Sequence, residues 1–278
     1  MKKIIFTAIL SLLSLDAAEI ALGSGTFGYD FTLQKTMGAN VTLDITVLSF
    51  KERRLPLTRK LFFYANLDIY RSKTLDDYAA YPDAASDLLP IGDIAQGAGV
   101  PMPVSFEMRG IDMSVGLGYT LLRRERSYLA VGVETGASIP YMETENMLEN
   151  VERFEQILKT TKTDIMTYKL LPALLGHYGF NDYLALDGSF SFGYQFGSIS
   201  NDYLKGDADF SGTVLHTDIA LLATPFKNDF QFAIGYRLSK WSVTSMDVTV
   251  AGIGHDFSRN LDMDFDTRYF YLSGGWRF

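Results

Sequence analysis

The sequence predicts an all-β protein, a transmembrane antiparallel up-and-down β-barrel of about ten strands, with eight or twelve strands as alternatives. Period-two alternation of apolar and polar residues recurs along the chain, the polar residues are mostly small, and long connections alternate with short ones. The 278 residues suit a single barrel domain. Cysteine is absent, which excludes a disulfide framework, and the net charge of −8 argues against nucleic acid as a partner.

The first residues have the features of a secretory signal peptide. Lys2 and Lys3 precede an apolar stretch at residues 4–15, and the small residues Ala17 and Ala18 follow it. Such a stretch is too short to span a bilayer as a helix. We therefore expect a signal peptide at 1–18, cleaved after Ala17 or Ala18, and a barrel domain at 19–278; a retained N-terminal anchor is the alternative.

Ten strands account for the alternation. We expect them at 23–34, 39–50, 60–71, 105–121, 127–139, 164–176, 183–199, 211–223, 230–244 and 266–278. The pattern is clearest in VTLDITV of the second, GIDMSVGLGYTL of the fourth, LALDGSFSFGYQF of the seventh, FQFAIGYRL of the ninth and RYFYLSGGWRF of the tenth. Each of these segments has an apolar face opposite a face of mostly Gly, Ser, Thr and Asp.

The small size of the polar residues decides between two all-β architectures. A soluble β-sandwich, which is the alternative, would show long charged side chains to water on its outer face. Small polar residues instead fit the inside of a narrow closed barrel whose apolar face is turned toward lipid. Because a bilayer forbids open strand edges, the strands must close into a barrel.

The connections support the same topology. The long ones, at 72–104, 140–163 and 245–265, all fall on one side of the sheet, and short turns fall on the other side together with both termini. The loop at 72–104 is acidic. The segment at 145–160 has the apolar spacing of an amphipathic helix, which could pack on the barrel rim or dock a surface partner. The turn segments KERRLPLTRK and RRERS are basic and could contact anionic phospholipid headgroups.

The terminus GWRF resembles the C-terminal signature of bacterial outer-membrane β-barrel proteins. In that superfamily the barrel-insertion machinery reads a last strand of alternating apolar residues that ends on Phe. The resemblance implies an outer-membrane location and an insertion signal formed by Phe270, Leu272, Trp276 and Phe278. The family pattern usually has Gly where this chain has Ser273, and the resemblance identifies no subfamily.

The parity of the strands assigns a set of charged residues to the barrel lumen. These are Asp30, Asp44, Asp68, Asp112, Glu134, Lys169, Asp187, His216, Asp218, Arg237 and Arg277. One interpretation is a network of hydrogen bonds and ion pairs that fills a narrow barrel, because buried charges are costly unless paired. The other is a narrow pore that prefers cations, because acids outnumber bases in the set.

No catalytic motif stands out. The ten-stranded omptin proteases use an Asp-x-His pair, and outer-membrane phospholipase A uses His-x-Ser; neither pattern occurs in this chain. His216 and Asp218 share one face of a strand and are weak candidates for a base and its orienting carboxylate. We therefore expect a structural, adhesive or narrow-pore barrel without metal or cofactor, and the alternative is an outer-membrane hydrolase of lipid or peptide that uses His216 and Asp218.

Overall fold

The computed structural model describes residues 19–33, 37–74, 104–146, 160–201, 206–225, 230–250, 253–256 and 261–276, and every regular element in these ranges is a β-strand. The strands are β1 (Glu19–Leu33), β2 (Met37–Pro56), β3 (Leu61–Ser72), β4 (Val104–Arg124), β5 (Ser127–Asn146), β6 (Thr160–Gly179), β7 (Leu184–Asn201), β8 (Gly206–Ala223), β9 (Phe230–Val250), β10 (Ile253–Asp256) and β11 (Leu261–Trp276). Within these ranges, no helix has the length and apolarity that crossing a membrane requires.

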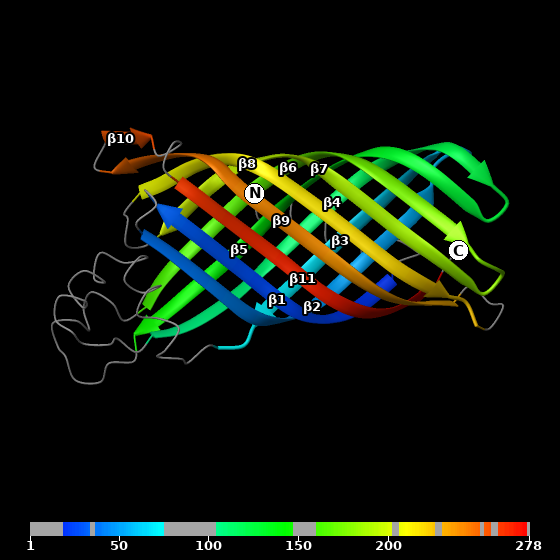
Figure 1. Cartoon of the computed structure of the whole chain (residues 1–278), viewed down its shortest axis with the longest axis horizontal. Helices are drawn as coiled ribbons and strands as arrows, with labels where there is room; N and C mark the ends of the chain where they lie inside the picture. Colours follow the sequence, from blue (N-terminus) through cyan, green and yellow to red (C-terminus); the bar gives the residue numbers. More distant parts are fainter. Residues whose placement is uncertain are drawn as a thin grey trace.

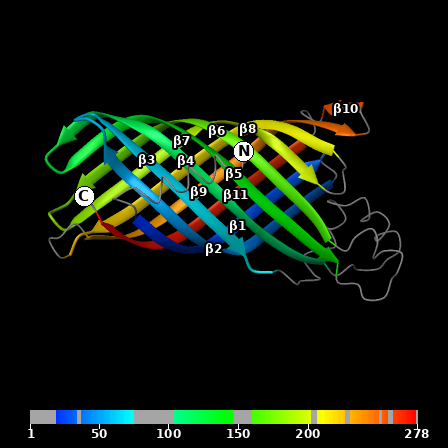
Figure 2. The same cartoon turned by 180° about the vertical axis from the view of Figure 1, so that it is seen from behind.

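The long strands close into one barrel. Each strand from β1 to β9 pairs antiparallel with the next, β9 pairs with β11, and β11 pairs with β1. The four-residue β10 pairs only with the outer end of β9 and lies beyond the rim of the barrel (Figures 1 and 2). The up-and-down barrel of ten long strands is therefore confirmed. We call the end that carries the short turns at 57–60, 125–126 and 180–183 the turn side, and the opposite end the loop side.

The strands are longer than the sequence pattern indicates. β2, β5 and β6 have 20 residues and β4 and β9 have 21, whereas a tilted strand needs about 9–11 residues to span a bilayer. The expected loops at 140–163 and 245–265 are accordingly shorter, because β5, β6, β9, β10 and β11 occupy much of them. Outside the described residues lie the signal peptide at 1–18, residues 277–278 and, apart from its strand ends, the expected helix at 145–160.

An apolar belt encircles the turn-side half of the barrel. Its members are large exposed side chains that point away from the lumen, among them Ile20, Leu22, Leu48, Leu117, Val133, Leu170, Leu174, Leu186, Phe190, Phe192, Ile219, Ile234, Phe270 and Leu272. Leu22 and Phe270 are 64% and 68% exposed. A soluble protein would not leave such a continuous apolar surface open to water. The belt is the surface that faces hydrocarbon in a membrane-spanning barrel.

On the loop side the polarity of the two faces is reversed. The outward surface there carries ion pairs, including Arg71 with Glu107 at 2.8 Å and Lys240 with Asp264 at 2.8 Å. The interior is an apolar core, whose members include Phe27, Tyr29, Leu43, Ile45, Tyr70, Met108, Met142, Ile165, Phe210, Trp241, Met263 and Phe265. The loop-side half is therefore built like a water-exposed barrel with a filled interior.

This reversal corrects the expected position of two acids. Asp30 and Asp44 are exposed on the outside of β1 and β2, whereas Leu43, Ile45 and Val47 are buried inside. The prediction assumed that the apolar face of each strand points outward along its whole length. Beyond the membrane belt the outward face meets water, so the apolar residues turn inward and the acids outward.

Aromatic rings fill the lumen by lying over glycines of the next strand. A Cβ atom at Gly116 of β4 would overlap the ring of Tyr64 of β3, and one at Gly235 of β9 would overlap the ring of Tyr271 of β11. Only glycine allows a ring to approach the neighbouring backbone so closely. These contacts tie adjacent strands together from the inside and hold the charged groups around them in place.

Candidate functional site in the barrel interior

Four strands bring a buried polar cluster together at mid-barrel. Lys169 of β6 donates hydrogen bonds from Nζ to both carboxylate oxygens of Asp112 of β4, at 2.8 and 2.7 Å. The same ammonium lies 3.2 Å from Nε2 of His216 of β8, and Nδ1 of His216 lies 2.9 Å from Glu134 of β5. All four side chains are buried, so these contacts satisfy groups that have left water.

A second cluster centres on Asp218 of β8. Its carboxylate accepts hydrogen bonds from Lys51 Nζ at 2.6 Å and Tyr271 OH at 2.5 Å, and Arg237 Nη1 lies 3.4 Å away. Arg237 also places Nε 3.1 Å from Asp68, to which Ser49 donates a hydrogen bond at 2.5 Å. The cluster links β2, β3, β8, β9 and β11 across the lumen.

A third cluster lies nearest the turn side. Arg53 of β2 contacts Glu19 at 2.6 Å, Asp187 at 3.4 Å and the hydroxyl of Tyr271 at 3.1 Å. Asp187 in turn lies 3.2 Å from Nδ1 of His177. Each acid of this layer therefore has a cationic or imidazole neighbour, and Tyr271 joins this cluster to that of Asp218.

The structure brings most of the predicted lumen residues onto the inward face. Asp68, Asp112, Glu134, Lys169, His216, Asp218 and Arg237 are buried there, and Asp187 is half-buried. Arg277 lies outside the described residues. Sequence reasoning missed Lys51, Arg53 and Glu19, because it ended the second strand at residue 50 and treated Lys51 and Arg53 as part of a basic turn. The alternation of Ser49, Lys51 and Arg53 carried the signal that the strand continues.

His216 and Asp218 do not form a catalytic pair. His216 contacts Glu134 and Lys169, and Asp218 contacts Lys51, Arg237 and Tyr271. Ser191 lies opposite His216 on β7, but its hydroxyl donates to Glu134 at 3.4 Å. In a hydrolytic triad the ring nitrogen remote from the acid would face the serine. Here that nitrogen faces the ammonium of Lys169, which cannot accept a proton from a serine while it is charged.

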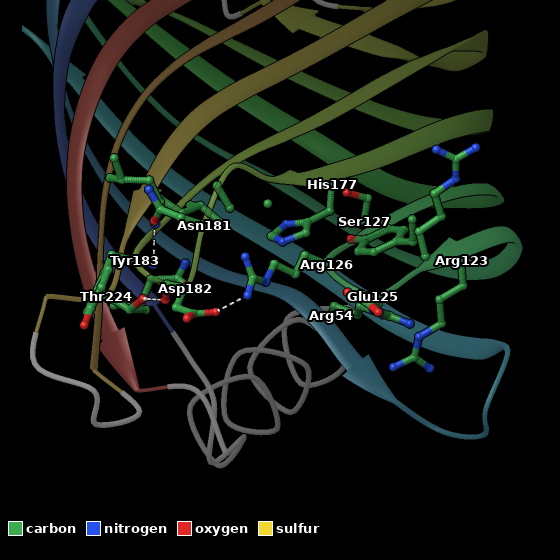
Figure 3. A pocket seen from close by; sticks show the side chains of 17 residues that line it. Arg54, Arg123, Glu125, Arg126, Ser127, His177, Asn181, Asp182, Tyr183 and Thr224 are labelled. Atoms are coloured by element: carbon green, nitrogen blue, oxygen red, sulfur yellow. Dashed lines mark hydrogen bonds and ion pairs between the residues drawn. The ribbon is translucent and has the colours of Figure 1, made fainter.

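A chamber opens into the barrel from the turn side. Its outermost part has a volume of about 290 Å³ and is lined by Arg54, Arg123, Arg126, Tyr128 and His177 among others (Figure 3). Tyr128 lies between two cationic or aromatic neighbours: the guanidinium of Arg54 is 4.3 Å from its centroid, and the ring of His177 stacks on it at 5.6 Å. Arg126 pairs with Asp182 at 2.7 Å across the rim.

The chamber narrows toward the ionic clusters. Deeper in the lumen a cavity of about 60 Å³ is lined by Lys51, Arg53, Glu134, Asp218 and Arg237 among others. Unsatisfied polar atoms of Glu52, Tyr64 and Asn66 also belong to residues of its wall. Such a space holds water molecules and no large ligand. Within the described part of the chain, no group of three or more His, Cys, Asp or Glu side chains could hold a metal ion.

Comparison with known proteins places the fold. The crystal structure of the outer membrane protease OmpT from Escherichia coli matches with a TM-score of 0.54 and 8% identity, over 95% of this chain and 98% of that one. The attachment invasion locus protein Ail of Yersinia pestis has a TM-score of 0.33 and 8% identity, over 95% of this chain and 99% of that one. The translocator domain of the autotransporter NalP from Neisseria meningitidis has a TM-score of 0.35 and 8% identity, over 100% and 94%.

The chain has the fold of a bacterial outer-membrane β-barrel. No protein-family model matches it, and no curated protein sequence does either. Identities of this size carry the fold and no activity. The fold and the apolar belt together place the chain in the outer membrane, because a closed barrel with a lipid-facing band is how strands cross that bilayer.

Proposed function

We propose that this chain is a sealed, non-enzymatic outer-membrane barrel, a rigid support that displays its loop-side segments at the cell surface in a structural or adhesive role. The observation that carries the proposal is the filling of the lumen by two layers in series. The apolar core closes the loop-side half, and the ionic clusters close the middle. A pore would need a continuous polar path through both.

The apolar layer is dense. The ring of Trp241 stacks on that of Phe265 with centroids 3.8 Å apart, and Phe27 packs against both Phe265 and Tyr70 at 6.1 Å. An ion that entered this region would lose its water without gaining polar partners, which is very costly. Apolar constrictions of this kind stop ions in channels as well.

The ionic layer opposes conduction for a different reason. The acids at its centre are each held by a buried cation: Asp112 by Lys169, and both Asp68 and Asp218 by Arg237. An acidic ring that favours cations needs carboxylates that are free to replace the hydration shell of the ion. Carboxylates that already accept hydrogen bonds from Lys and Arg act as fixed structure, so this layer supports a support role over a cation-selective pore.

The loop-side half supports a role at the surface. About 9–11 residues of each strand suffice to cross the bilayer, so strands of 20 or 21 residues stand well clear of it. The outward ion pairs keep this part soluble, and its apolar core keeps it rigid. Whatever the loops contact is held at a fixed distance from the lipid headgroups.

Conductance in planar bilayers tests the proposal. Barrels whose insertion is verified by heat-modifiable migration on gels should give no stable current steps. Large, regular steps would overturn the sealed interior. The hydrolase alternative is tested in parallel with His216→Ala on lipid and peptide substrates, and a wild-type activity that this change abolished would contradict the non-enzymatic role.

A further inference from the structure

The lipid-facing side of the barrel has a hollow near the turn-side end. It has a volume of about 490 Å³ and spans the outer surface of four neighbouring strands, β5 to β8. Two glycines form its floor, because Gly176 of β6 pairs directly with Gly188 of β7. In the same row, Leu129 of β5 pairs with Gly176 and Ile219 of β8 pairs with Gly188. The row therefore has a side chain at each end and none at its centre.

The walls of the hollow are apolar and exposed. Leu129 and Ile219 stand on its two flanks, and Tyr178 and Leu186, which pair across β6 and β7, stand on the side nearer the turns. A Cβ atom placed on Gly176 would have no neighbour within 4 Å. One placed on Gly188 would meet only a backbone oxygen, at 3.8 Å. The space over the glycines is thus open and no side chain of the barrel fills it.

A cation stands at the rim of this apolar space. Arg124, the last residue of β4, is exposed and lines the hollow. The acid that also lines it, Asp187, has its carboxylate in the lumen with Arg53 and His177. Exposed rings at the same end, Tyr178 and Phe180, are the residues expected at the level of lipid headgroups.

We propose that the hollow binds one phospholipid of the leaflet on the turn side, with an acyl chain over Gly176 and Gly188 and its phosphate at Arg124. Within a bilayer an unfilled hollow forfeits dispersion contacts on every wall, and a flexible acyl chain restores them. The guanidinium of Arg124 recognises the phosphate, because Arg presents several donors to such oxygens. The site is separate from the lumen and does not depend on whether the barrel conducts.

Native mass spectrometry of the purified barrel tests the proposal, with phosphatidylglycerol and diacylglycerol of the same chains offered as separate probes. We expect the wild type to retain one phosphatidylglycerol and to hold diacylglycerol more weakly. Gly176→Val with Gly188→Val fills the hollow and should reduce retention of both probes about tenfold, the loss expected when about two methylene groups no longer pack. Arg124→Gln should remove the preference for the phosphate and leave diacylglycerol binding unchanged.

The valine variants suit the test because the hollow has room for them and β-branched residues favour strands, so the barrel should still fold. Heat-modifiable migration verifies this. The matched control is Gly274→Ala, because Gly274 also faces outward but its Cβ position already meets the ring of Phe230 at 3.3 Å. This variant should keep its lipid. Undiminished retention in the double valine variant, or the mass of a dimer in place of a bound lipid in the wild type, would overturn the proposal.

Discussion

The ion pair between Lys169 and Asp112 gives the sharpest test of how the lumen is stabilised. Lys169→Met keeps the length of the side chain and removes the ammonium, which leaves the carboxylate of Asp112 without two hydrogen bonds of 2.8 and 2.7 Å. The Lys169 side chain is 2% exposed and that of Asp112 is 12% exposed, so water replaces little of what is lost. Breaking one partner of a buried pair costs about 3–5 kcal/mol, because the remaining charge stays buried.

Urea unfolding in detergent micelles measures this cost. Trp241 reports on the transition, because its indole is buried in the apolar core on the ring of Phe265. With a slope of about 2 kcal/mol per M, a loss of about 4 kcal/mol lowers the unfolding midpoint by about 2 M. Combining Lys169→Met with Asp112→Leu removes the orphaned charge, and we expect the double variant to recover more than half of the lost stability.

Arg71→Met is the matched control for this prediction. Arg71 pairs with Glu107 at 2.8 Å on the outside of the loop-side half, where its side chain is 71% exposed. An exposed pair contributes about 0–1 kcal/mol, so the midpoint should move little. A loss for Lys169→Met no larger than that for Arg71→Met would refute the reasoning that the lumen network is buried from water. A double variant weaker than both of its single variants would refute the coupling.

Three further outcomes follow from the packing. Trp241→Ala should cost about 3–5 kcal/mol of unfolding free energy in the same urea assay, as for other buried large-to-small changes, and a loss below 1 kcal/mol would mean that the apolar layer is loose. Gly235→Val should abolish the heat-modifiable folded band because the new side chain overlaps the ring of Tyr271, and adding Tyr271→Ala should restore it. Leu22→Arg, in the belt, should cost about 2–4 kcal/mol in liposomes, whereas Asp44→Arg, beyond it, should cost less than 1; equal costs would contradict the position of the belt.

The fold could be predicted because a lipid-facing barrel imposes a pattern that sequence reveals directly. The period of two in LALDGSFSFGYQF places Phe190, Phe192 and Tyr194 on one face, and the structure exposes all three to the membrane side. The order of long and short connections gave the strand count, since each long connection must lie opposite a short one. The bounds were less accessible, because a strand that leaves the membrane has no reason to stop at the headgroups.

The lumen network could be predicted only as a set of residues. Parity shows that Lys169 and His216 point inward, but the partners of each come from strands far apart in sequence, and the register of every ladder decides which acid meets which base. Lys51 and Arg53 were missed for a related reason: a run of charge at a strand end is typical of a turn. Asp30 and Asp44 failed because period-two alternation is unchanged when the two faces exchange their surroundings.

That exchange occurs at one level across neighbouring strands, which identifies it as the edge of the membrane. Leu22 pairs with Leu48, and Leu48 pairs with Ile69, and all three are exposed and apolar. Two residues further toward the loop side the matching row is Ser24, Thr46 and Arg71. A local irregularity would affect one strand, whereas a change of solvent affects every strand that crosses it. The apolar core begins inside the barrel where the apolar belt ends outside, because a barrel that stands in water needs an interior to bury its apolar residues. The same chain is thus a membrane barrel at one end and a water-exposed barrel at the other, and the second part is what holds the loops away from the lipid.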